Sequence, residues 1–255
     1  MSICKLYRIG KYPAGLVVYN TSMKTSLSIV IPAYDEEESL GFVLKDTLKK
    51  LPKYFSDYEV IVVDDGSKDK TGEIADSFAK KDKHLKVIHQ QNSGYNKAMI
   101  VGLAQASKDY VGYMQADGQN LVDDFKDYYK LLPDNDLVIV GRGKPEDYNL
   151  LRLILHHGCF LLYYILFGLQ FDDPHWVYFW KTKEVQKLKL DSNGGVFLLA
   201  ESLVKFKRKG LKIVEVPVKY RSRLAGEQKA VKPKVIWRTF WSIIRLWWQI
   251  VIGKV

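Results

Sequence analysis

Two short acidic loops hold the side chains of this sequence that are best suited to chemistry. The first is Asp64-Asp65-Gly66-Ser67 and the second is Gln115-Ala116-Asp117-Gly118-Gln119. Each loop follows a strongly apolar run, at residues 60–63 and 110–114. Carboxylates at the carboxyl ends of neighbouring parallel strands are where an open α/β sheet binds a nucleotide or a metal. The two loops therefore predict an enzyme that acts on a nucleotide-linked substrate.

Alternating strand and helix patterns must position these loops. Strands are predicted at residues 27–31, 59–63, 86–89, 110–114, 137–140 and 211–218, with the first ending at Pro32. Helices are predicted at residues 40–51, 97–106 and 121–132, and another begins at about residue 71, where Ser67 and Asp69 are expected to cap it. Strands separated by helices of this length favour an α/β fold with a mostly parallel central sheet and flanking helices.

Composition narrows the class of protein. The chain has 255 residues, 47% of them hydrophobic, which is ample for one large domain. Its two cysteines, Cys4 and Cys159, lie far apart, so no disulfide framework or zinc site is expected and a reducing, cytoplasmic setting is favoured. Residues 1–25 lack a continuous apolar stretch and are predicted to be an N-terminal extension without a signal peptide.

The positive charge is concentrated near the C-terminus. Residues 203–238 hold twelve Lys and Arg against Glu215 and Glu227, which accounts for the whole net charge of +10. Such a basic end favours an anionic partner: a phosphate, an acidic lipid or a nucleic acid. Nucleic acid ranks lowest of the three, because the aromatic residues nearby are tryptophans among aliphatics and not a stacking platform.

The last segment has the pattern of a helix that lies on a membrane. Residues 235–252 hold four tryptophans, together with Arg238 and Arg245 seven positions apart. This arrangement predicts an amphipathic helix in the membrane interface, peripheral or monotopic. Two alternatives remain: a spanning helix, which the two arginines disfavour, and a core helix docked on the domain. The uncharged run at residues 158–169 is too short to span a bilayer.

Four motifs, in order, resemble those of family-2 glycosyltransferases with the GT-A fold. They are Ile31-Pro32-Ala33-Tyr34-Asp35-Glu36-Glu37, residues 62–71 around Asp64, Asn92-Ser93-Gly94-Tyr95-Asn96-Lys97-Ala98, and residues 115–119. A later stretch, residues 215–229, resembles the subgroup that includes dolichyl-phosphate mannosyltransferase and bacterial polyprenyl-phosphate glycosyltransferases. The resemblance covers residues 26–240 and implies a GT-A domain at 26–230, followed by the membrane-associating segment at 231–255.

The resemblance implies where the nucleotide-sugar donor binds. The nucleotide-binding residues would be Pro32, Tyr34, Glu36, Asp64, Asp65 and Lys97. A buried carboxylate such as Asp64 would accept hydrogen bonds from a base N–H or from ribose hydroxyls.

The resemblance also implies a divalent cation, Mg²⁺ or Mn²⁺, at the second acidic loop. Asp117 and Gln119 would be catalytic and would hold the cation, with Gln115 as a third ligand. A hard cation on carboxylate oxygen neutralises the diphosphate that leaves. Family members usually have Asp-x-Asp here, and Gln115 stands in place of the first aspartate. With one formal charge fewer, cation binding is expected to be weaker.

On the acceptor side, Arg221, Arg223 and Lys229 are predicted to bind a phosphate. A phosphate monoester is largely dianionic at neutral pH, so it needs positioning but no general base. The prediction is an inverting transfer from a nucleotide-diphosphate sugar to a polyprenyl phosphate at the cytoplasmic face of a membrane. The alternatives are transfer to a glycan or lipid-linked saccharide, and a catalytically weak membrane scaffold. The sugar, the base and the oligomeric state stay open.

Overall fold

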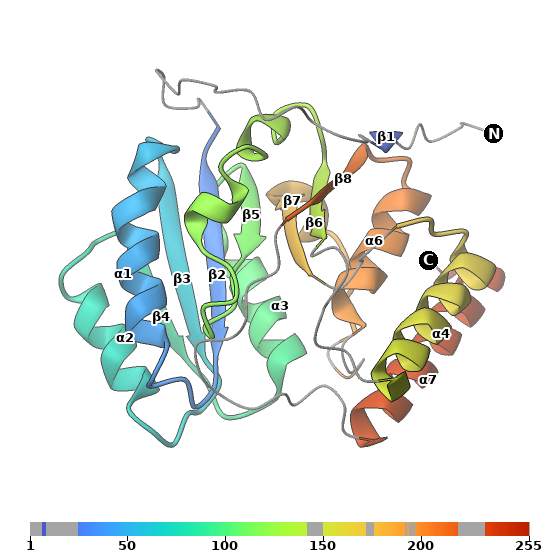
Figure 1. The fold of residues 1–255 in the computed structure, drawn as a ribbon, viewed down its shortest axis with the longest axis horizontal. Helices are drawn as coiled ribbons and strands as arrows, with labels where there is room; N and C mark the ends of the chain where they lie inside the picture. Colours follow the sequence, from blue (N-terminus) through green and yellow to red (C-terminus); the bar gives the residue numbers. More distant parts are fainter. Residues whose placement is uncertain are drawn as a thin grey trace.

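A mixed eight-stranded sheet forms the centre of the part of the chain that the structure describes. In this computed structural model the described residues are 7–8, 25–141, 150–171, 176–191, 193, 197–218 and 233–254. The strand order is β1-β8-β6-β7-β5-β2-β3-β4 (Figure 1). The strands are β1 (Tyr7–Arg8), β2 (Leu27–Ala33), β3 (Tyr58–Asp64), β4 (Leu85–His89), β5 (Tyr110–Tyr113), β6 (Leu137–Gly141), β7 (Val177–Lys181) and β8 (Ile213–Pro217).

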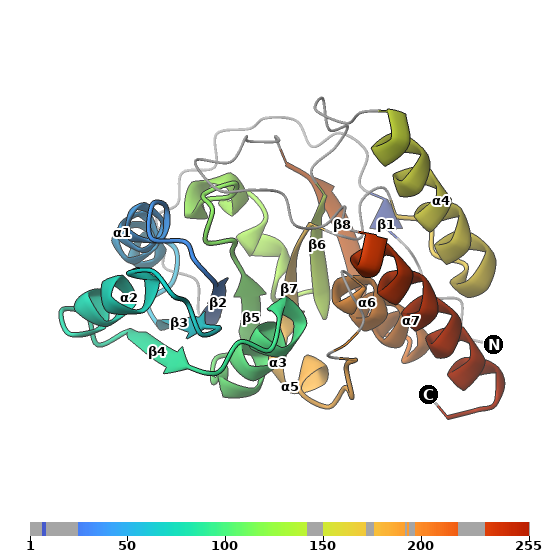
Figure 2. The same cartoon turned by 90° about the horizontal axis from the view of Figure 1, so that it is seen from below.

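Helices flank this sheet. They are α1 (Leu40–Lys50), α2 (Thr71–Ala79), α3 (Tyr95–Gln105), α4 (Leu150–Phe167), α5 (Thr182–Val185), α6 (Leu198–Arg208) and α7 (Pro233–Val251). Figure 2 shows α1 and α2 over one face of β2, β3 and β4, with α3 on the opposite face. Strand β3 is buried along its whole length, as expected for a central strand covered on both sides.

Most strand pairs are parallel, which confirms the predicted α/β class. The exception is β7, which lies between β5 and β6 and is antiparallel to both. This strand was not predicted from the sequence. Its first four residues are all buried, so it shows no apolar–polar alternation to mark it.

Two local predictions were wrong. The helix expected at residues 121–132 is instead two 3₁₀ segments, η2 (Val122–Phe125) and η3 (Tyr129–Leu131). Phe125 and Tyr129 pack edge-on against Phe179, and this tertiary packing replaces a continuous amphipathic face. A third 3₁₀ segment, η1 (Leu51–Lys53), follows α1.

Strand β2 continues through Pro32 instead of ending there. Its pairing with β5 stops at Val30, while its pairing with β3 runs on to Ala33. The nitrogen of Pro32 points to the β5 side, like that of Val30, so the missing N–H removes no hydrogen bond from the ladder.

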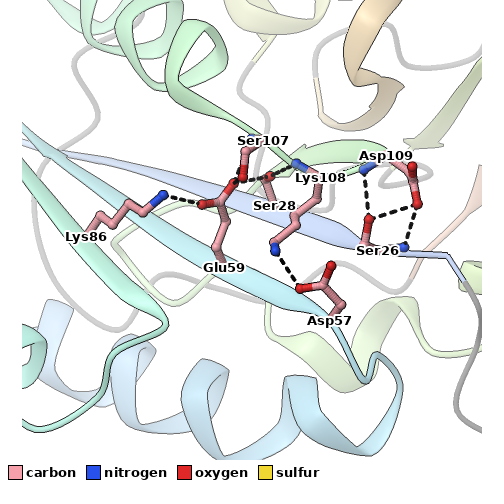
Figure 3. A network of polar contacts seen from close by, with 8 residues as sticks. All are labelled: Ser26, Ser28, Asp57, Glu59, Lys86, Ser107, Lys108 and Asp109. Carbon is pink, nitrogen blue, oxygen red and sulfur yellow. Dashed lines mark hydrogen bonds and ion pairs between the residues drawn. The ribbon is translucent and has the colours of Figure 1, made fainter.

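A polar network ties the amino-terminal ends of the strands together (Figure 3). The buried carboxylate of Glu59 accepts hydrogen bonds from Ser28 Oγ (2.8 Å), Ser107 N (2.7 Å), Ser107 Oγ (2.8 Å) and Lys86 Nζ (2.7 Å). These partners come from β2, β4 and the loop before β5. This edge of the sheet is therefore held by charge and hydrogen bonds, and the opposite edge is left for the acidic loops.

Close packing at Gly112 of β5 gives a stability prediction. A Cβ atom there would lie 2.4 Å from Phe179 Cδ1, a separation that side chains do not tolerate. We expect Gly112→Ala to lower the free energy of unfolding by about 1–3 kcal/mol through overpacking, measured by urea denaturation. The matched control is Gly158→Ala on α4, where nothing lies within 4 Å and alanine favours the helix. Equal effects at both positions would contradict the packing argument.

The C-terminal segment forms α7, as predicted, and it packs beside α4 (Figure 1). Thr239, Ser242, Ile243 and Leu246 are buried on one side of α7, so the helix is docked on the body. On its other side Trp237, Trp241 and Trp248 are 62%, 49% and 56% exposed. Arg245 forms an ion pair with Asp191, while Arg238 is exposed. No helix among the described residues is both long enough and apolar enough to cross a bilayer.

Candidate active site

The sheet topology brings the predicted donor-site segments to one edge. Strands β5, β2 and β3 are adjacent and parallel, with Val30 opposite Tyr113 and Ala33 opposite Asp64. The segments that follow these strands, 34–36, 64–67 and 115–119, therefore emerge side by side. The predicted placement at the carboxyl end of a parallel sheet is what the structure has.

Asp117 lies in a tight, buried loop. The residue is 5% exposed, so its carboxyl group does not point into bulk water. The backbone N–H of Gln119 donates to Asp117 Oδ1 at 3.0 Å. Gly118 has a φ of 75°, a conformation that favours glycine. Gln119 is also buried. The loop thus holds the Asp117 carboxylate in a defined orientation.

Asn120 orders the same loop and was not predicted from the sequence. It is almost fully buried, and its Oδ1 accepts from the Gln115 amide at 3.2 Å. Its Nδ2 donates to Gln115 Oε1 at 3.4 Å. Asn120 therefore fixes both the backbone and the side chain of Gln115. An asparagine directly after a predicted ligand loop was the available signal.

Asp65 anchors the loop that leads into α3. Its Oδ1 accepts from Gln90 Nε2 at 2.6 Å and from the Ser93 amide at 2.9 Å, and its Oδ2 accepts from the Gly94 amide at 2.8 Å. The side chain is buried. These contacts bring the start of α3 to the site edge. A direct contact of Asp65 with nucleotide stays a prediction.

The first turn of α3 faces the Asp117 loop. Tyr95 is 44% exposed as a residue, but desolvation of its hydroxyl and the nearby charge of Asp117 raise its pKa, against a hydrogen bond with Tyr113 that lowers it. Lys97 is exposed on the same turn and is available to an anionic ligand. Asn96 is buried, and its Oδ1 has no hydrogen-bond partner among the described residues. The N-terminus of a helix with a lysine nearby favours a negative charge.

Asp64 ends β3 with both oxygens in use. Its Oδ1 accepts from the Ser67 amide at 3.0 Å, and its Oδ2 lies 2.9 Å from His89 Nδ1. Burial alone would raise the pKa of this carboxyl group, but the hydrogen bonds from Ser67 and His89 outweigh it and lower the pKa. Asp64 is therefore a carboxylate at neutral pH. His89, at the end of β4, was not identified from the sequence.

The loop after β2 is fastened to the loop after β3. The Asp35 amide donates to Ser67 Oγ at 3.1 Å, and the Glu36 amide donates to Thr71 Oγ1 at 2.7 Å. Asp69 Oδ1 accepts from the Thr71 amide at 2.9 Å at the start of α2, but the N-cap residue is Lys70 and makes no side-chain cap hydrogen bond, so Asp69 is not the N-cap. The predicted capping role of Ser67 was wrong, because its hydroxyl is used by Asp35 instead.

Tyr34 and Glu36 follow β2 at this edge and are half-buried, as is Pro32 in the strand. Their nucleotide contacts stay predictions. The acceptor residues Arg221, Arg223 and Lys229 lie outside the described residues, as does the predicted domain boundary at residue 230. Their roles and that boundary also stay predictions.

The donor set fits a cation that is bound together with a diphosphate. Within the described residues, no group of three or more His, Cys, Asp or Glu side chains is arranged to hold a metal. Asp117 would supply one carboxylate, and Gln115 and Gln119 would supply amide oxygens. Mg²⁺ is commonly held in this way, by one or two carboxylates plus substrate phosphates and water.

An α/β sheet of this topology, with a buried aspartate after β5 and carboxylates after β3, has the arrangement expected of a GT-A fold. The family model for glycosyl transferase family 2 matches residues 28–190. The chain therefore belongs to glycosyltransferase family 2.

Individual relatives add detail. The chain is 30% identical to the dolichol-phosphate mannosyltransferase of Pyrococcus furiosus over 228 residues, 86% of this chain and 63% of that protein. It is 29% identical to the undecaprenyl-phosphate mannosyltransferase of Micrococcus luteus, over 86% of this chain and 94% of that protein. Other curated relatives are matched over a smaller part: an uncharacterised glycosyltransferase of Bacillus subtilis is covered for 33% of its length.

Among solved structures, the fold resembles glucosyl-3-phosphoglycerate synthase of Mycobacterium tuberculosis in complex with Mn²⁺, UDP-glucose and phosphoglyceric acid. The TM-score is 0.66 at 20% identity, covering 86% of this chain and 80% of that one. At this identity the likeness supports the fold alone. The Mn²⁺ belongs to that structure.

Proposed function

We propose that this protein transfers a sugar from a nucleotide-diphosphate sugar to a polyprenyl phosphate, with inversion at the anomeric carbon. The observation that carries the proposal is the buried Asp117 carboxylate at the carboxyl end of β5. It lies in a chain whose relatives over 86% of its length are named for polyprenyl-phosphate substrates. The donor sugar and base are not part of the proposal.

For this reaction the protein mainly has to position the two substrates and neutralise charge. The acceptor phosphate is already dianionic at neutral pH and attacks without a general base. Asp117, with Gln119 and Gln115, would hold Mg²⁺ or Mn²⁺, which supplies charge neutralisation for the leaving diphosphate. Lys97 on the first turn of α3 adds positive charge, and Arg221, Arg223 and Lys229 would bind the acceptor phosphate.

We place the reaction at the cytoplasmic face of a membrane, to which the protein binds peripherally. Two helices that lie side by side support this placement. On α7, Trp237, Trp241 and Trp248 are exposed on the side opposite its docked face, and α4 exposes Leu161, Tyr164 and Ile165. Aromatic and aliphatic side chains of this kind enter the headgroup region, where the basic Arg238 meets anionic lipid.

This placement predicts the effect of removing tryptophans from the exposed side of α7. We expect Trp241→Ser with Trp248→Ser to weaken binding to phosphatidylglycerol-containing vesicles about tenfold or more, since each buried tryptophan removes a large apolar area from water. Vesicle pelleting measures the effect. The control is Phe42→Ser, a residue of α1 that is 50% exposed. Helix α1 lies on the opposite side of the molecule from α7 (Figure 1). Equal vesicle binding by all three proteins would contradict the placement.

The function is tested by product analysis. The protein is incubated with radiolabelled UDP- and GDP-sugars, undecaprenyl or dolichyl phosphate, and Mg²⁺ or Mn²⁺. The expected product is extracted into organic solvent and releases its label in mild acid, as a polyprenyl phosphosugar does. Label transferred to an added glycan or lipid-linked saccharide would favour that acceptor instead. Absence of transfer from every donor would favour the scaffold interpretation.

A further inference from the structure

The histidine that ends β4 is held between two carboxylates. His89 Nδ1 lies 2.9 Å from Asp64 Oδ2, and His89 Nε2 lies 3.2 Å from Asp76 Oδ1 on α2. A carboxylate only accepts hydrogen bonds, so a ring nitrogen must carry a proton to bond to it. Both contacts are hydrogen bonds only when the ring is the doubly protonated imidazolium. The geometry therefore specifies the charged form of His89.

Among the described residues, few groups surround the contact between Asp64 and His89. The charged groups that face His89 are Asp64 from β3 and Asp76 from α2. Gly72 of α2 lies against the pair without adding charge, and a Cβ there would lie 2.9 Å from Asp64 Oδ2 and 3.3 Å from His89 Cε1. A glycine at this position lets the helix backbone approach the Asp64–His89 contact closely. The α2 backbone therefore covers the buried Asp64 side of the contact, while the His89 side chain remains 49% exposed.

We propose that His89 is a positioning residue for the donor nucleoside, which it serves by holding the Asp64 carboxylate in one orientation with its remaining lone pairs turned toward the site edge. The inference rests on the proposed function, because Asp64 is its predicted nucleoside contact. Asp76 in turn holds His89. A chain of three side chains thus links α2 and β4 to the nucleoside end of the site.

This arrangement makes donor binding depend on pH. The hydrogen bond with Asp64 and then that with Asp76 raise the pKa of His89 above its ordinary value of 6.5, against the opposing effect of burial. Below that raised pKa both hydrogen bonds are present. As the pH rises through it, the neutral ring retains one N–H, and one lone pair comes to face a carboxylate. Donor affinity should then fall.

Two substitutions separate the two ring nitrogens. In His89→Asn the side-chain amide stands near the place of Nδ1 and can still donate to Asp64. In His89→Gln the amide stands near the place of Nε2 and can donate to Asp76 only. Neither side chain titrates. We expect His89→Asn to bind donor diphosphate as the wild type does at low pH, and His89→Gln to bind about tenfold more weakly, the size of a lost hydrogen bond to a charged group.

The probes are UDP and GDP, each with Mn²⁺, titrated calorimetrically between pH 6 and pH 9. Because a terminal phosphate itself titrates at about pH 6, the effect is taken as the difference between the wild type and His89→Asn in the same buffers. As the pH rises, the nucleotide affinity of the wild type should fall relative to that of His89→Asn. Asp76→Asn removes one of the two charges that raise the pKa of His89. In this variant nucleotide affinity should therefore fall at a lower pH than in the wild type. Kinetically, His89→Gln should raise KM for the donor more than it lowers kcat.

A second histidine supplies the matched control. His84 lies just before β4, at the opposite end of the strand, and its Nδ1 lies 2.8 Å from Asp82 Oδ1. Its ring stacks on Tyr58, away from the acidic loops. His84→Asn and His84→Gln should leave nucleotide affinity and its pH profile unchanged. Thermal unfolding without nucleotide records any loss of stability separately.

The outcomes distinguish the two proposals. If the wild type binds neither UDP nor GDP and transfers no sugar, the proposed function fails. If the wild type binds one of them while His89→Gln keeps its affinity and pH profile, the positioning role of His89 is wrong. The same conclusion follows if the His84 variants lose as much affinity as His89→Gln.

Discussion

Asp117→Asn should reduce sugar transfer by about 10²–10³-fold, the usual loss when one group that stabilises developing charge is removed. The substitution takes away the carboxylate charge expected to hold the cation against the leaving diphosphate. It keeps an oxygen that can accept from the Gln119 amide, so the loop and the fold should persist. The measurement is the rate of label transfer to polyprenyl phosphate at saturating donor.

The control for Asp117 is Asp134→Asn, the same chemical change on an exposed residue before β6. Strand β6 runs parallel to β5, so Asp134 lies at the sheet edge opposite the site. Its transfer rate should equal that of the wild type. Both variants should keep the wild-type melting temperature and vesicle binding. Full transfer activity in Asp117→Asn would overturn the assignment of this residue.

Glu59→Gln should lower the free energy of unfolding at pH 7 by about 3 kcal/mol. Burial acts to raise the pKa of Glu59, yet the hydrogen bonds from Lys86, Ser107 and Ser28 lower it from 4.5 to about 2. A pKa that is lower in the folded state means that the charged form stabilises the fold. A shift of this size corresponds to about 3 kcal/mol, at 1.36 kcal/mol for each pKa unit.

The sign of the pH dependence follows from the same shift. The stabilisation by Glu59 is fully present above pH 4.5 and is lost as the pH falls toward about 2. The difference in unfolding free energy between wild type and Glu59→Gln should therefore shrink over that range. Urea denaturation at a series of pH values measures it. Asp57→Asn, which breaks an exposed ion pair with Lys108 at the same edge, should cost less than about 1 kcal/mol. A pH-independent difference for Glu59→Gln would contradict this account.

The order of residues along the chain was enough to predict the fold class and to predict that the two acidic loops lie at the same end of the sheet. Apolar runs that alternate with helical patterns implied a mostly parallel sheet, and the acidic turns after residues 63 and 114 implied a shared edge. These features are local, because strand patterns, turn glycines and short motifs are each formed by consecutive residues. The same locality explains why the Trp-rich α7 could be predicted as a helix.

Tertiary packing determined the features that local sequence patterns do not encode. Strand β7 is buried on both faces, and residues 122–131 follow aromatic packing instead of a helical period. His89 and Asn120 were not predicted as site residues. The role of a histidine or an asparagine depends on the group that folding places next to its side chain. His89 lies 25 residues from Asp64 along the chain, and the pairing of β3 with β4 brings their side chains to 2.9 Å. Contacts between distant residues depend on strand order and register, which only the folded chain defines.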